Sequence, residues 1–432
     1  MQTRKITVTA ALFLLLALML SVTTVAEEPD VSMGDLFIEY TFYETEDAQQ
    51  SLLSTASAYA WGEDTRYFDQ LTEKGKTIYT NIENAFANGA VKALTASGSD
   101  TVEEWEIGIV FSEAIATSEF SSWASSMKPV LQQAYTAFIF DHPEYFWIRG
   151  ELYLRYGGSY VGNEMDAQIY ITTPAMPECN TQAKIDAFQA EIDKVVEKLL
   201  HDTENMPVVA RLGYWDQWLA EDNDYNLSAA NDSTYIKRDA SPWSIIGGFL
   251  SGYEPVCEGY AKAFQLLCNK IGVPCVQISG NGHRWTAVRL DGKWYVADPT
   301  WDDPVYNGIA TQAYSTKNYF LVSRSSSHSP SMILTSPEIS DTGYFAESGW
   351  VRSADAVTGF QKSNSSVLLI ALYEENGRML DVRTCPSFRW GYSSYMYLAP
   401  DFDAAVLQKA AKASSFALSG SFTASQTEKT EF

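Results

Sequence analysis

The sequence predicts an α+β fold in which one helix packs on an antiparallel sheet. An amphipathic run begins at Cys257 and stops at Gly272, which is the pattern of a helix. Residues 273–278 have the pattern of a buried strand, and Asp291-Gly292 joins two further strand-like segments as a hairpin. Because these elements follow one another directly, we expect them to share one core.

The Cys257 thiol is expected in the first turn of this helix. Pro255 precedes it, and apolar residues recur after it at helical spacing, namely Ala261, Phe264, Leu267 and Cys268. The unpaired N–H groups of a helix start and the helix dipole favour an anion. The sequence therefore predicts a nucleophilic thiolate at this position.

The hairpin loop predicts which residues share a face of the sheet. A two-residue Asp-Gly loop pairs its flanking residues, so Leu290 should lie opposite Lys293. Counting back places His283 on the same face as Asp298, as diagonal neighbours within side-chain reach. A thiol nucleophile needs a base to take its proton and a third group to orient that base. Cys257, His283 and Asp298 are therefore the candidate catalytic residues, although each alone could be a core or strand-end residue.

Three separated blocks of this stretch resemble the transglutaminase-like superfamily, especially its bacterial members. They are Cys-Glu-Gly-Tyr-Ala at 257–261, His283-x-Trp285, and Asp-Pro-Thr-Trp-Asp-Asp-Pro at 298–304. The resemblance implies a papain-like core, in which a helix that carries the cysteine packs on an antiparallel sheet that carries the histidine and the aspartate. It also implies acyl transfer at a carboxamide through a thioester. Arg284 departs from the pattern, since many relatives carry a small residue there.

Length and charge limit what the rest of the chain can be. At 432 residues the chain is too long for one ordinary domain, and two or three are expected. Its 54 acidic and 30 basic side chains give a net charge of −24, which excludes nucleic-acid binding by phosphate neutralisation. This acidity weakly favours cationic partners, and solubility outside the cell is its simpler explanation.

The N-terminus has the pattern of a secretory signal peptide. Arg4 and Lys5 precede a short apolar run that ends at a small cleavage position, Ala26. The uncharged run 6–26 could also just span a bilayer as an uncleaved anchor. The shortness of the apolar core favours cleavage, so we expect residues 1–26 to be a signal peptide and the mature protein to be extracellular or at the cell surface.

Residues 27–200 are expected to form a helix-rich N-terminal domain. Apolar stripes at helical spacing predict helices at 67–90, within 111–140 and at 182–200. Strands are predicted at 36–43, 152–156 and 167–172, with a turn at Gly157-Gly158. His142, in the Asp-His-Pro-Glu segment, is open to two interpretations: part of a functional cluster or, more simply, a helix end before an aromatic core segment.

Residues 201–330 are expected to hold the transglutaminase-like core. A short helix is predicted at 214–219, and the polar stretch 221–239 is expected to be a loop beside the site. A further strand is predicted at 318–322. The serine-rich stretch 323–331 lacks periodicity, so we expect a linker or an exposed loop.

The C-terminal part is expected to be a small all-β module at 343–418, followed by a disordered tail at 419–432. Strand-like segments at 367–373 and 378–382 flank the hairpin turn Glu375-Asn376-Gly377. Modules of this kind more often bind a partner or separate other domains than catalyse a reaction.

Cysteines and histidines limit the possible cross-links and metal sites. The chain has 5 cysteines, so an exported protein would keep at least one unpaired thiol or form an intermolecular bridge. Cys268 and Cys275 are the pair that could meet. The histidines are His142, His201, His283 and His328. They lack the spacing of a metal site, so neither a metal nor another cofactor is expected.

The active site would also need donors for an oxyanion. The backbone N–H of Cys257 is a natural one because it stands at a helix start. Trp243, Tyr253 and Gln265 are candidates for a second donor that the sequence does not assign; Trp243 is the better candidate, although a core tryptophan is the simpler interpretation. Gln265 would lie about 12 Å along the helix axis from Cys257, which makes it a poor candidate.

Two classes of function fit these observations. The first is an exported thiol acyl-transfer enzyme that acts on protein or peptide substrates, either as a transglutaminase, when an amine resolves the thioester, or as a cysteine peptidase or amidase, when water does. The second is a catalytically silent binding module at the cell surface, whose 12 tryptophans and 25 tyrosines could hold cell-surface proteins or glycans. The complete set of Cys257, His283 and Asp298 favours the first class.

Overall fold

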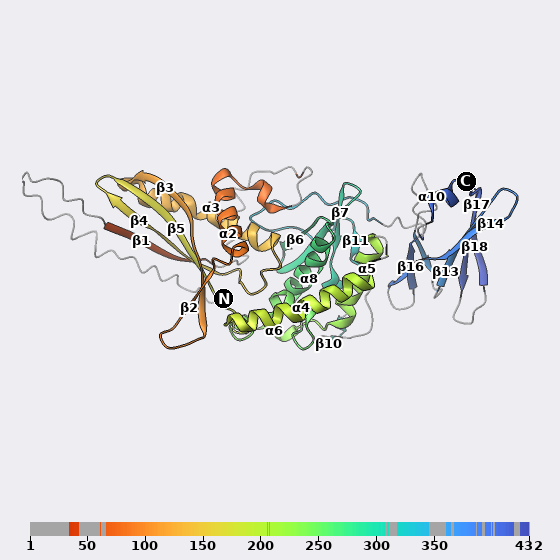
Figure 1. Ribbon diagram of the computed structural model, residues 1–432, viewed down its shortest axis with the longest axis horizontal. Helices are drawn as coiled ribbons and strands as arrows, with labels where there is room; N and C mark the ends of the chain where they lie inside the picture. The colour runs from red at the N-terminus through yellow and green to blue at the C-terminus, as the bar shows by residue number, and fades with distance from the viewer. Residues whose placement is uncertain are drawn as a thin grey trace, which may run out of the picture. The chain divides into compact units, whose positions relative to one another are not determined.

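The computed structural model describes residues 34–42, 61, 66–204, 206, 208–303, 305–306, 309–310, 318–344, 360–363, 367–385, 387–390, 394–398, 400, 402–418 and 424–431. The chain divides into two compact units, Met1–Ile185 with Ser331–Thr335, and Asp186–Pro330 with Ser336–Phe432. Helices and antiparallel sheets occur together, as predicted (Figure 1). Within these ranges no helix is long and apolar enough to cross a membrane. The expected signal peptide, residues 1–26, lies outside the described residues.

The first unit is built on a five-stranded antiparallel sheet in the order β1-β4-β5-β3-β2. Its strands are β1 (Gly34–Phe42), β2 (Lys92–Thr95), β3 (Val102–Ala116), β4 (Leu152–Val161) and β5 (Glu164–Pro174). Alternate residues of β4, such as Leu152, Leu154 and Tyr156, are buried, which is the period of a strand with one face on a core. The helical elements are η2 (Tyr67–Gln70), α2 (Glu73–Ala87), η3 (Thr117–Glu119) and α3 (Phe120–Asp141). Helix α2 contacts both β3 and α3.

The prediction of helix within 111–140 was wrong for its first residues. Strand β3 continues to Ala116, and α3 begins only at Phe120. Because β3 pairs with β5 from Glu104 to Ala116, the backbone groups of this segment bond to the neighbouring strand. The N-terminal region therefore contains a substantial sheet, so its description as helix-rich is incomplete.

The prediction of a turn at Gly157-Gly158 was also wrong. Strand β4 runs through both glycines, and the chain reverses between Val161 and Glu164, which pair with each other. A Cβ atom on Gly158 would lie 1.9 Å from the carbonyl oxygen of Asp166. The close approach of β5, rather than a chain reversal, requires glycine there.

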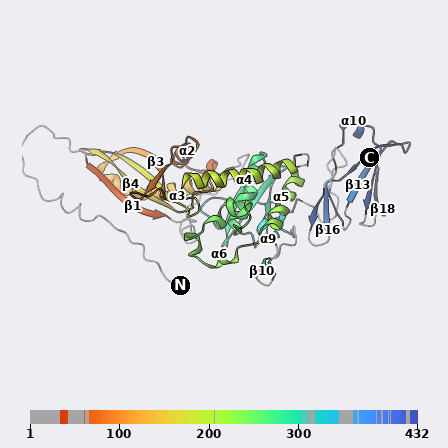
Figure 2. The same ribbon diagram turned by 60° about the horizontal axis from the view of Figure 1, so that its bottom comes forward.

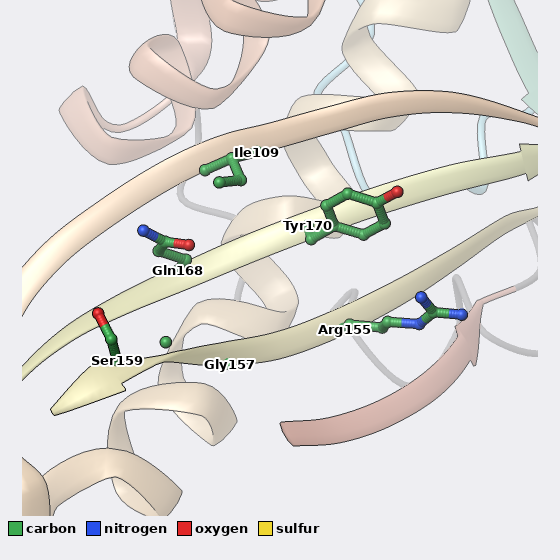
Figure 3. A pocket seen from close by; sticks show the side chains of 7 residues that line it. Ile109, Arg155, Gly157, Ser159, Gln168 and Tyr170 are labelled. Carbon is green, nitrogen blue, oxygen red and sulfur yellow. The ribbon is translucent and has the colours of Figure 1, made fainter. Parts of the chain in front are cut away.

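The side chains on the other face of this sheet border a pocket of about 310 Å³ (Figure 3). Its lining residues include Ile109, Arg155, Gly157, Ser159, Gln168 and Tyr170. The Arg155 guanidinium lies 5.8 Å from the centre of the Tyr170 ring. Burial and the carboxylate of Glu106 raise the pKa of Tyr170 to about 12. The pocket is formed by residues of the first unit.

The second unit contains a four-stranded antiparallel sheet in the order β11-β8-β7-β6. Its strands are β6 (Cys275–Gly280), β7 (His283–Leu290), β8 (Lys293–Ala297) and β11 (Phe320–Val322). Helix α8 (Cys257–Lys270) contacts β6 and β7 (Figure 1). Its buried residues include Ala261, Phe264 and Leu267. The predicted helix and its neighbouring strands are confirmed.

The hairpin between β7 and β8 has the predicted register. Leu290 pairs with Lys293, and the pairing continues to Thr286 and Ala297. Asp291 and Gly292 have φ angles of 50° and 79°, the left-handed values that a two-residue hairpin loop requires. This register brings the beginning of β7 next to the end of β8, where the candidate residues lie.

Further helices surround this core (Figure 2). They are α4 (Gln182–Asp202), α5 (Val208–Asp222), α6 (Leu227–Asn231), η4 (Tyr235–Lys237), η5 (Ser241–Trp243), α7 (Ile245–Phe249) and α9 (Pro299–Asp302). Helices α5, α7 and α9 contact α8. The short strands β9 (Val305–Tyr306) and β10 (Ile309–Ala310) pair with each other.

The described C-terminal residues form two antiparallel sheets, in the orders β12-β16-β15 and β14-β13-β17-β18. The elements are β12 (Phe360–Ser363), β13 (Val367–Tyr373), β14 (Met379–Thr384), β15 (Ser387–Trp390), β16 (Ser394–Leu398), α10 (Ala404–Leu407), β17 (Lys412–Leu418) and β18 (Ala424–Glu431). The expectation of a disordered tail was wrong for 424–431, because β18 pairs with β17. Pairing at a sheet edge satisfies backbone N–H and C=O groups even in a polar segment.

Candidate active site

Cys257 is the first residue of α8, and its side chain is partly exposed. The preceding residue, Val256, is extended, with φ −97° and ψ 179°, so the helix begins abruptly at the cysteine. The N–H groups of a first helical turn lack intrahelical acceptors and favour a negative charge nearby. The other four cysteines are buried, and all five are free thiols. Cys257 is therefore the thiol that a substrate can reach.

The Cys268 and Cys275 thiols do meet, as the sequence allowed. They are joined by a side-chain hydrogen bond between α8 and β6. Burial raises the pKa of Cys268 well above its ordinary value, and the bond to Cys275 adds to this effect. This pair is an unreactive part of the core.

His283 lies at the start of β7 and connects the thiol with Asp298. Its Nε2 lies 2.7 Å from Oδ2 of Asp298. The imidazole is also hydrogen-bonded to Cys257, so Nδ1 is the nitrogen that faces the sulfur. Burial by itself lowers the pKa of His283, but the hydrogen bonds to Asp298 and Cys257 outweigh burial and raise the pKa to about 10. The geometry thus favours an imidazolium beside the sulfur.

Asp298 is fully buried, and each of its two carboxylate oxygens accepts hydrogen bonds from a different part of the site. Oδ1 accepts the backbone N–H of Trp301 at 3.3 Å and caps α9. Oδ2 accepts from His283, and a second imidazole, His328, places its Nε2 2.9 Å from the same oxygen. Burial raises the pKa of this carboxyl, but the two imidazoles outweigh burial and lower the pKa below its ordinary value. Asp298 therefore stays ionised although no water reaches it.

Aromatic rings fix the plane of the His283 imidazole. The Trp301 ring stacks on it at 4.7 Å with an interplanar angle of 7°, and the Trp285 ring lies at 5.8 Å and 22°. Such contacts stabilise one ring orientation and displace water from it. The Trp residue of the 298–304 block is thus a direct neighbour of the candidate base.

Tyr225 is a site residue that the sequence analysis did not select. Its hydroxyl is hydrogen-bonded to the backbone N–H of Cys257, and burial followed by the charge of the thiol raises the pKa of this hydroxyl. Its own backbone N–H donates to Asp303, which also accepts the hydroxyl of Tyr260 at 2.5 Å. Burial raises the pKa of Asp303 to about 7. Tyr225 is therefore held from both ends at the start of α8.

The three residues considered as a second oxyanion donor make other contacts. Gln265 donates to the carbonyl of Cys275 at 3.1 Å, within the packing of α8 on β6. Tyr253 packs edge-on against Phe188 at 5.5 Å. Trp243 accepts the Lys262 ammonium on its backbone carbonyl at 3.1 Å. The stretch 221–239 was expected to be a loop beside the site. Tyr225 lies beside the site, but the loop prediction was wrong for 227–231 and 235–237, which form α6 and η4. No local pattern distinguished Tyr225 within this stretch.

The stretch 323–331 is an exposed loop over most of its length, as expected, but His328 within it is buried. His328 is only 4% exposed, and its Nε2 faces Asp298. The Ser325 hydroxyl lies 3.2 Å from its Nδ1 and accepts its backbone N–H at 3.3 Å. A buried carboxylate needs hydrogen-bond donors, and this loop supplies one. The missing periodicity correctly identified an exposed loop, but it did not reveal that one residue of the loop, His328, is buried.

A buried ion pair links the residues that follow Cys257 and His283. Arg284 Nη1 lies 3.0 Å from Glu258 Oε1, and Lys262 Nζ lies 2.5 Å from the same oxygen. Burial raises the pKa of Glu258, but the two cations outweigh burial and lower it. Arg284, the departure from the family pattern, thus ties the cysteine-bearing helix to the histidine-bearing strand.

His283, Asp298 and His328 are also the one group of this kind, in the part of the chain that the structure describes, whose atoms could hold a metal ion. The three ligand atoms all lie within 4.8 Å of one another. However, the separations of 2.7 and 2.9 Å from Oδ2 are hydrogen-bond distances. Ligand atoms around a tetrahedral zinc ion lie about 3.3 Å apart, as bond lengths of about 2.0–2.1 Å require. The trio is therefore arranged as a hydrogen-bonded cluster.

Comparison with known proteins identifies the region around this site. The sequence profile of the transglutaminase-like superfamily matches residues 200–299. Human Kyphoscoliosis peptidase is 24% identical over 159 residues, which cover 32% of this chain and 23% of the human protein. The mouse protein of the same name is 28% identical over 100 residues, which cover 19% of this chain and 14% of the mouse protein. The chain thus spans less than a quarter of the length of these curated relatives.

A solved structure titled "Crystal structure of a TGase" is 16% identical and covers 37% of this chain and 47% of its own, with a TM-score of 0.24. The profile match includes Tyr225, Cys257, His283 and Asp298, and it ends before His328. The resemblance found in the sequence is confirmed: this chain carries a domain of the transglutaminase-like superfamily at residues 200–299.

Proposed function

We propose that this chain is a thiol acyl-transfer enzyme that acts on carboxamide groups of proteins or peptides through a thioester on Cys257. One observation carries the proposal. The thiol, both nitrogens of His283 and the buried carboxylate of Asp298 form a continuous hydrogen-bonded series. A thiol nucleophile requires a base and a group that orients the base, and this series supplies both.

The acylation step follows from this arrangement. The proton of the thiol moves to Nδ1 of His283, and the thiolate attacks the carboxamide carbon, so a C–S bond forms and the carbonyl oxygen becomes an oxyanion. In the free site the backbone N–H of Cys257 donates to the Tyr225 hydroxyl, and both groups would turn to the oxyanion when substrate displaces this bond. When the C–N bond breaks, the imidazolium gives its proton to the leaving nitrogen. A thioester and a neutral His283 remain.

Deacylation reverses the proton movements. Nδ1 of His283 takes a proton from the acceptor, which attacks the thioester, and the sulfur leaves as a thiolate. The proton on His283 then restores the starting pair. Water as acceptor gives a carboxylic acid, the reaction of a peptidase or amidase. A primary amine gives a new amide, the reaction of a transglutaminase. The curated relatives are named peptidases, so water as the acceptor has a precedent among similar proteins.

Asp298 has the role of orienting His283 and stabilising its imidazolium. Its bond to Nε2 keeps a proton on that nitrogen, so Nδ1 is free to exchange a proton with the sulfur. We further propose that the reaction takes place outside the cell membrane, because the first residues have the pattern of a signal peptide. Cell fractionation with an antibody to the C-terminal sheets tests this location.

Mass spectrometry of products tests the proposed reaction. The purified protein is incubated with glutamine-containing peptides and a primary amine, next to Cys257→Ala and a control, Cys179→Ala, which removes a buried thiol of the first unit. We expect amine adducts or new peptide termini with the wild type and the control, and neither with Cys257→Ala. Adducts identify a transglutaminase, and termini identify a peptidase. Products that persist in Cys257→Ala would contradict the proposal, and a folded wild type without products would favour the binding module.

A further inference from the structure

His328 is the neighbour of the site that the thiol, base and aspartate do not explain. Its side chain is 1% exposed, and its Nε2 points at the same carboxylate oxygen that orients His283. The residue lies 30 positions after Asp298, in a loop beyond the region that matches the superfamily. The fold therefore brings a second imidazole to a carboxylate that already has one.

The carboxylate of Asp298 determines where His328 carries a proton. An ionised carboxylate can only accept hydrogen bonds, so the His328 nitrogen that faces it, Nε2, carries a proton. On the other side of the ring, Ser325 Oγ accepts the backbone N–H of His328, lies 3.2 Å from Nδ1 and donates to Ser327 Oγ at 3.4 Å. His328 is therefore placed to donate to Asp298.

The remaining contacts of His328 are aromatic. Rings of Trp301, Trp285 and Tyr319 lie at 4.4, 5.1 and 5.8 Å from the imidazole. The titratable side chains that face it are Asp298, His283, whose ring centre lies at 6.3 Å, and Tyr319. This surrounding excludes water, so no solvent molecule can take the place of the Nε2–H donor on the carboxylate.

We propose that His328 is a second positioning residue of the site, which uses its Nε2–H to hold the Asp298 carboxylate ionised and aligned with His283. Two donors on Oδ2 leave the carboxylate little freedom to rotate, and its other oxygen is held by the α9 cap. The proposal rests on the proposed thiol chemistry, but it concerns the reactivity of the Cys257 thiol before any substrate binds. This reactivity can be measured on the free protein.

The test compares three substitutions in the full chain. His328→Leu removes the donor at similar volume, His328→Gln keeps an N–H donor near the position of Nε2, and Ser325→Ala removes the hydroxyl beside Nδ1 at an exposed position. His201→Gln, whose side chain is 77% exposed, is the control. The rate of Cys257 alkylation by iodoacetamide is measured from pH 3 to pH 10, and thermal melting is recorded for each protein.

We expect His328→Leu to slow alkylation at pH 7 by about 10- to 100-fold, the effect of removing one hydrogen-bond donor from a buried charge. The acid limb of its pH profile should move up, because Asp298 becomes easier to protonate. His328→Gln should stay within about threefold of the wild type, and Ser325→Ala should fall between Gln and Leu. The control should match the wild type.

Three results would overturn the proposal. One is a wild-type rate and pH profile for His328→Leu. Another is a His328→Gln variant as slow as the leucine variant, since the donor would then be irrelevant. The third is a change of the wild-type profile on adding a chelator, which would identify the same trio as a metal site. If His328→Leu does not fold, the glutamine and Ser325→Ala variants decide. If the variants change the alkylation profile as expected but the wild type forms no acyl-transfer product, only the proposed function is refuted.

Discussion

Two buried aspartates stand beside a histidine in this chain, one in each compact unit, and their hydrogen-bond donors differ. Asp298 of the second unit accepts from two imidazoles. Asp141 of the first unit accepts the backbone N–H groups of Tyr67 and Phe68 at 2.9 and 3.1 Å and the hydroxyl of Tyr79 at 3.1 Å. One carboxylate orients side chains, and the other holds the main chain of η2 against the end of α3.

The histidine next to Asp141 has partners of another kind. His142 Nδ1 lies 2.7 Å from Glu144, and its Nε2 lies 3.0 Å from the Tyr79 hydroxyl and 3.3 Å from Glu83. Carboxylates and a phenol therefore occupy the positions that a thiol and an aspartate occupy around His283. This geometry supports the simpler interpretation of the Asp-His-Pro-Glu segment, a helix end packed in an aromatic core.

The difference shows how donors decide the charge state of a buried carboxylate. Burial raises the pKa of Asp141 to about 6, although the main-chain N–H groups partly oppose it. At Asp298 the imidazoles outweigh burial and lower the pKa. Hydrogen-bond donors that can themselves carry a positive charge therefore keep a buried carboxylate ionised, and the ionised Asp298 can stabilise the imidazolium of His283. Four predictions test this contrast.

Replacing each aspartate should separate reactivity from structure most clearly. Asp298→Asn should lower the rate of product formation by about 10³- to 10⁴-fold, because the amide no longer favours the Nε2–H tautomer of His283. Asp141→Asn should leave the reactivity of Cys257 unchanged. Alkylation and product rates of both variants check this. Equal losses in the two variants would show that the contrast between the clusters is false.

The ion pair beside Cys257 should contribute the next largest effect. Arg284→Ala leaves the partly buried Glu258 paired with Lys262 alone, so we expect the free energy of unfolding to fall by about 1.5–3 kcal/mol, the range for one hydrogen bond to a charged group. Alkylation of Cys257 should slow as well, because the pair ties α8 to β7. Chemical denaturation measures the first effect. Arg378→Ala is the control, since Arg378 pairs with Glu374 at an exposed position, and its stability should match the wild type.

The two aspartates should give pH dependences of opposite sign. The folded-state pKa of Asp141 is raised, so its contribution to stability falls as pH rises from about 3.9 to about 6, by roughly 3 kcal/mol. The folded-state pKa of Asp298 is lowered, so its contribution is complete above about pH 3.9 and is lost as pH falls below that value.

Thermal melting of Asp141→Asn and Asp298→Asn between pH 3 and pH 8 measures these slopes. Relative to the wild type, Asp141→Asn should be more destabilising at pH 4 than at pH 7, and Asp298→Asn should be more destabilising at pH 7 than at pH 3. Slopes of the same sign would mean that both carboxylates have the same kind of environment.

Ring stacking should give the smallest effect. Trp301→Leu removes the ring that stacks on His283, and stacked pairs contribute about 0.5–1.5 kcal/mol beyond their burial. We therefore expect alkylation of Cys257 to slow by less than about tenfold. Tyr145→Leu is the matched change at His142, whose ring centre lies 5.6 Å away. It should leave alkylation unchanged, and a comparable slowing there would contradict the separation of the two clusters.

Local sequence was enough for the part of the site that lies on one helix and one hairpin. The helical spacing after Cys257 and the Asp291-Gly292 loop predicted α8 and the β7–β8 register, and through them the meeting of His283 with Asp298. Turn chemistry and side-chain period act between near neighbours in the chain, so they can be read from the residues themselves.

The folded chain was needed for Tyr225 and His328, and for the end of β3. Tyr225 reaches the backbone of Cys257 from a polar segment, and His328 reaches Asp298 from a serine-rich loop, neither with a periodic pattern. Strand β3 extends as far as its partner β5 does. Buried charges and unpaired backbone groups take their partners from whatever the packed fold brings beside them, and no single segment carries that information.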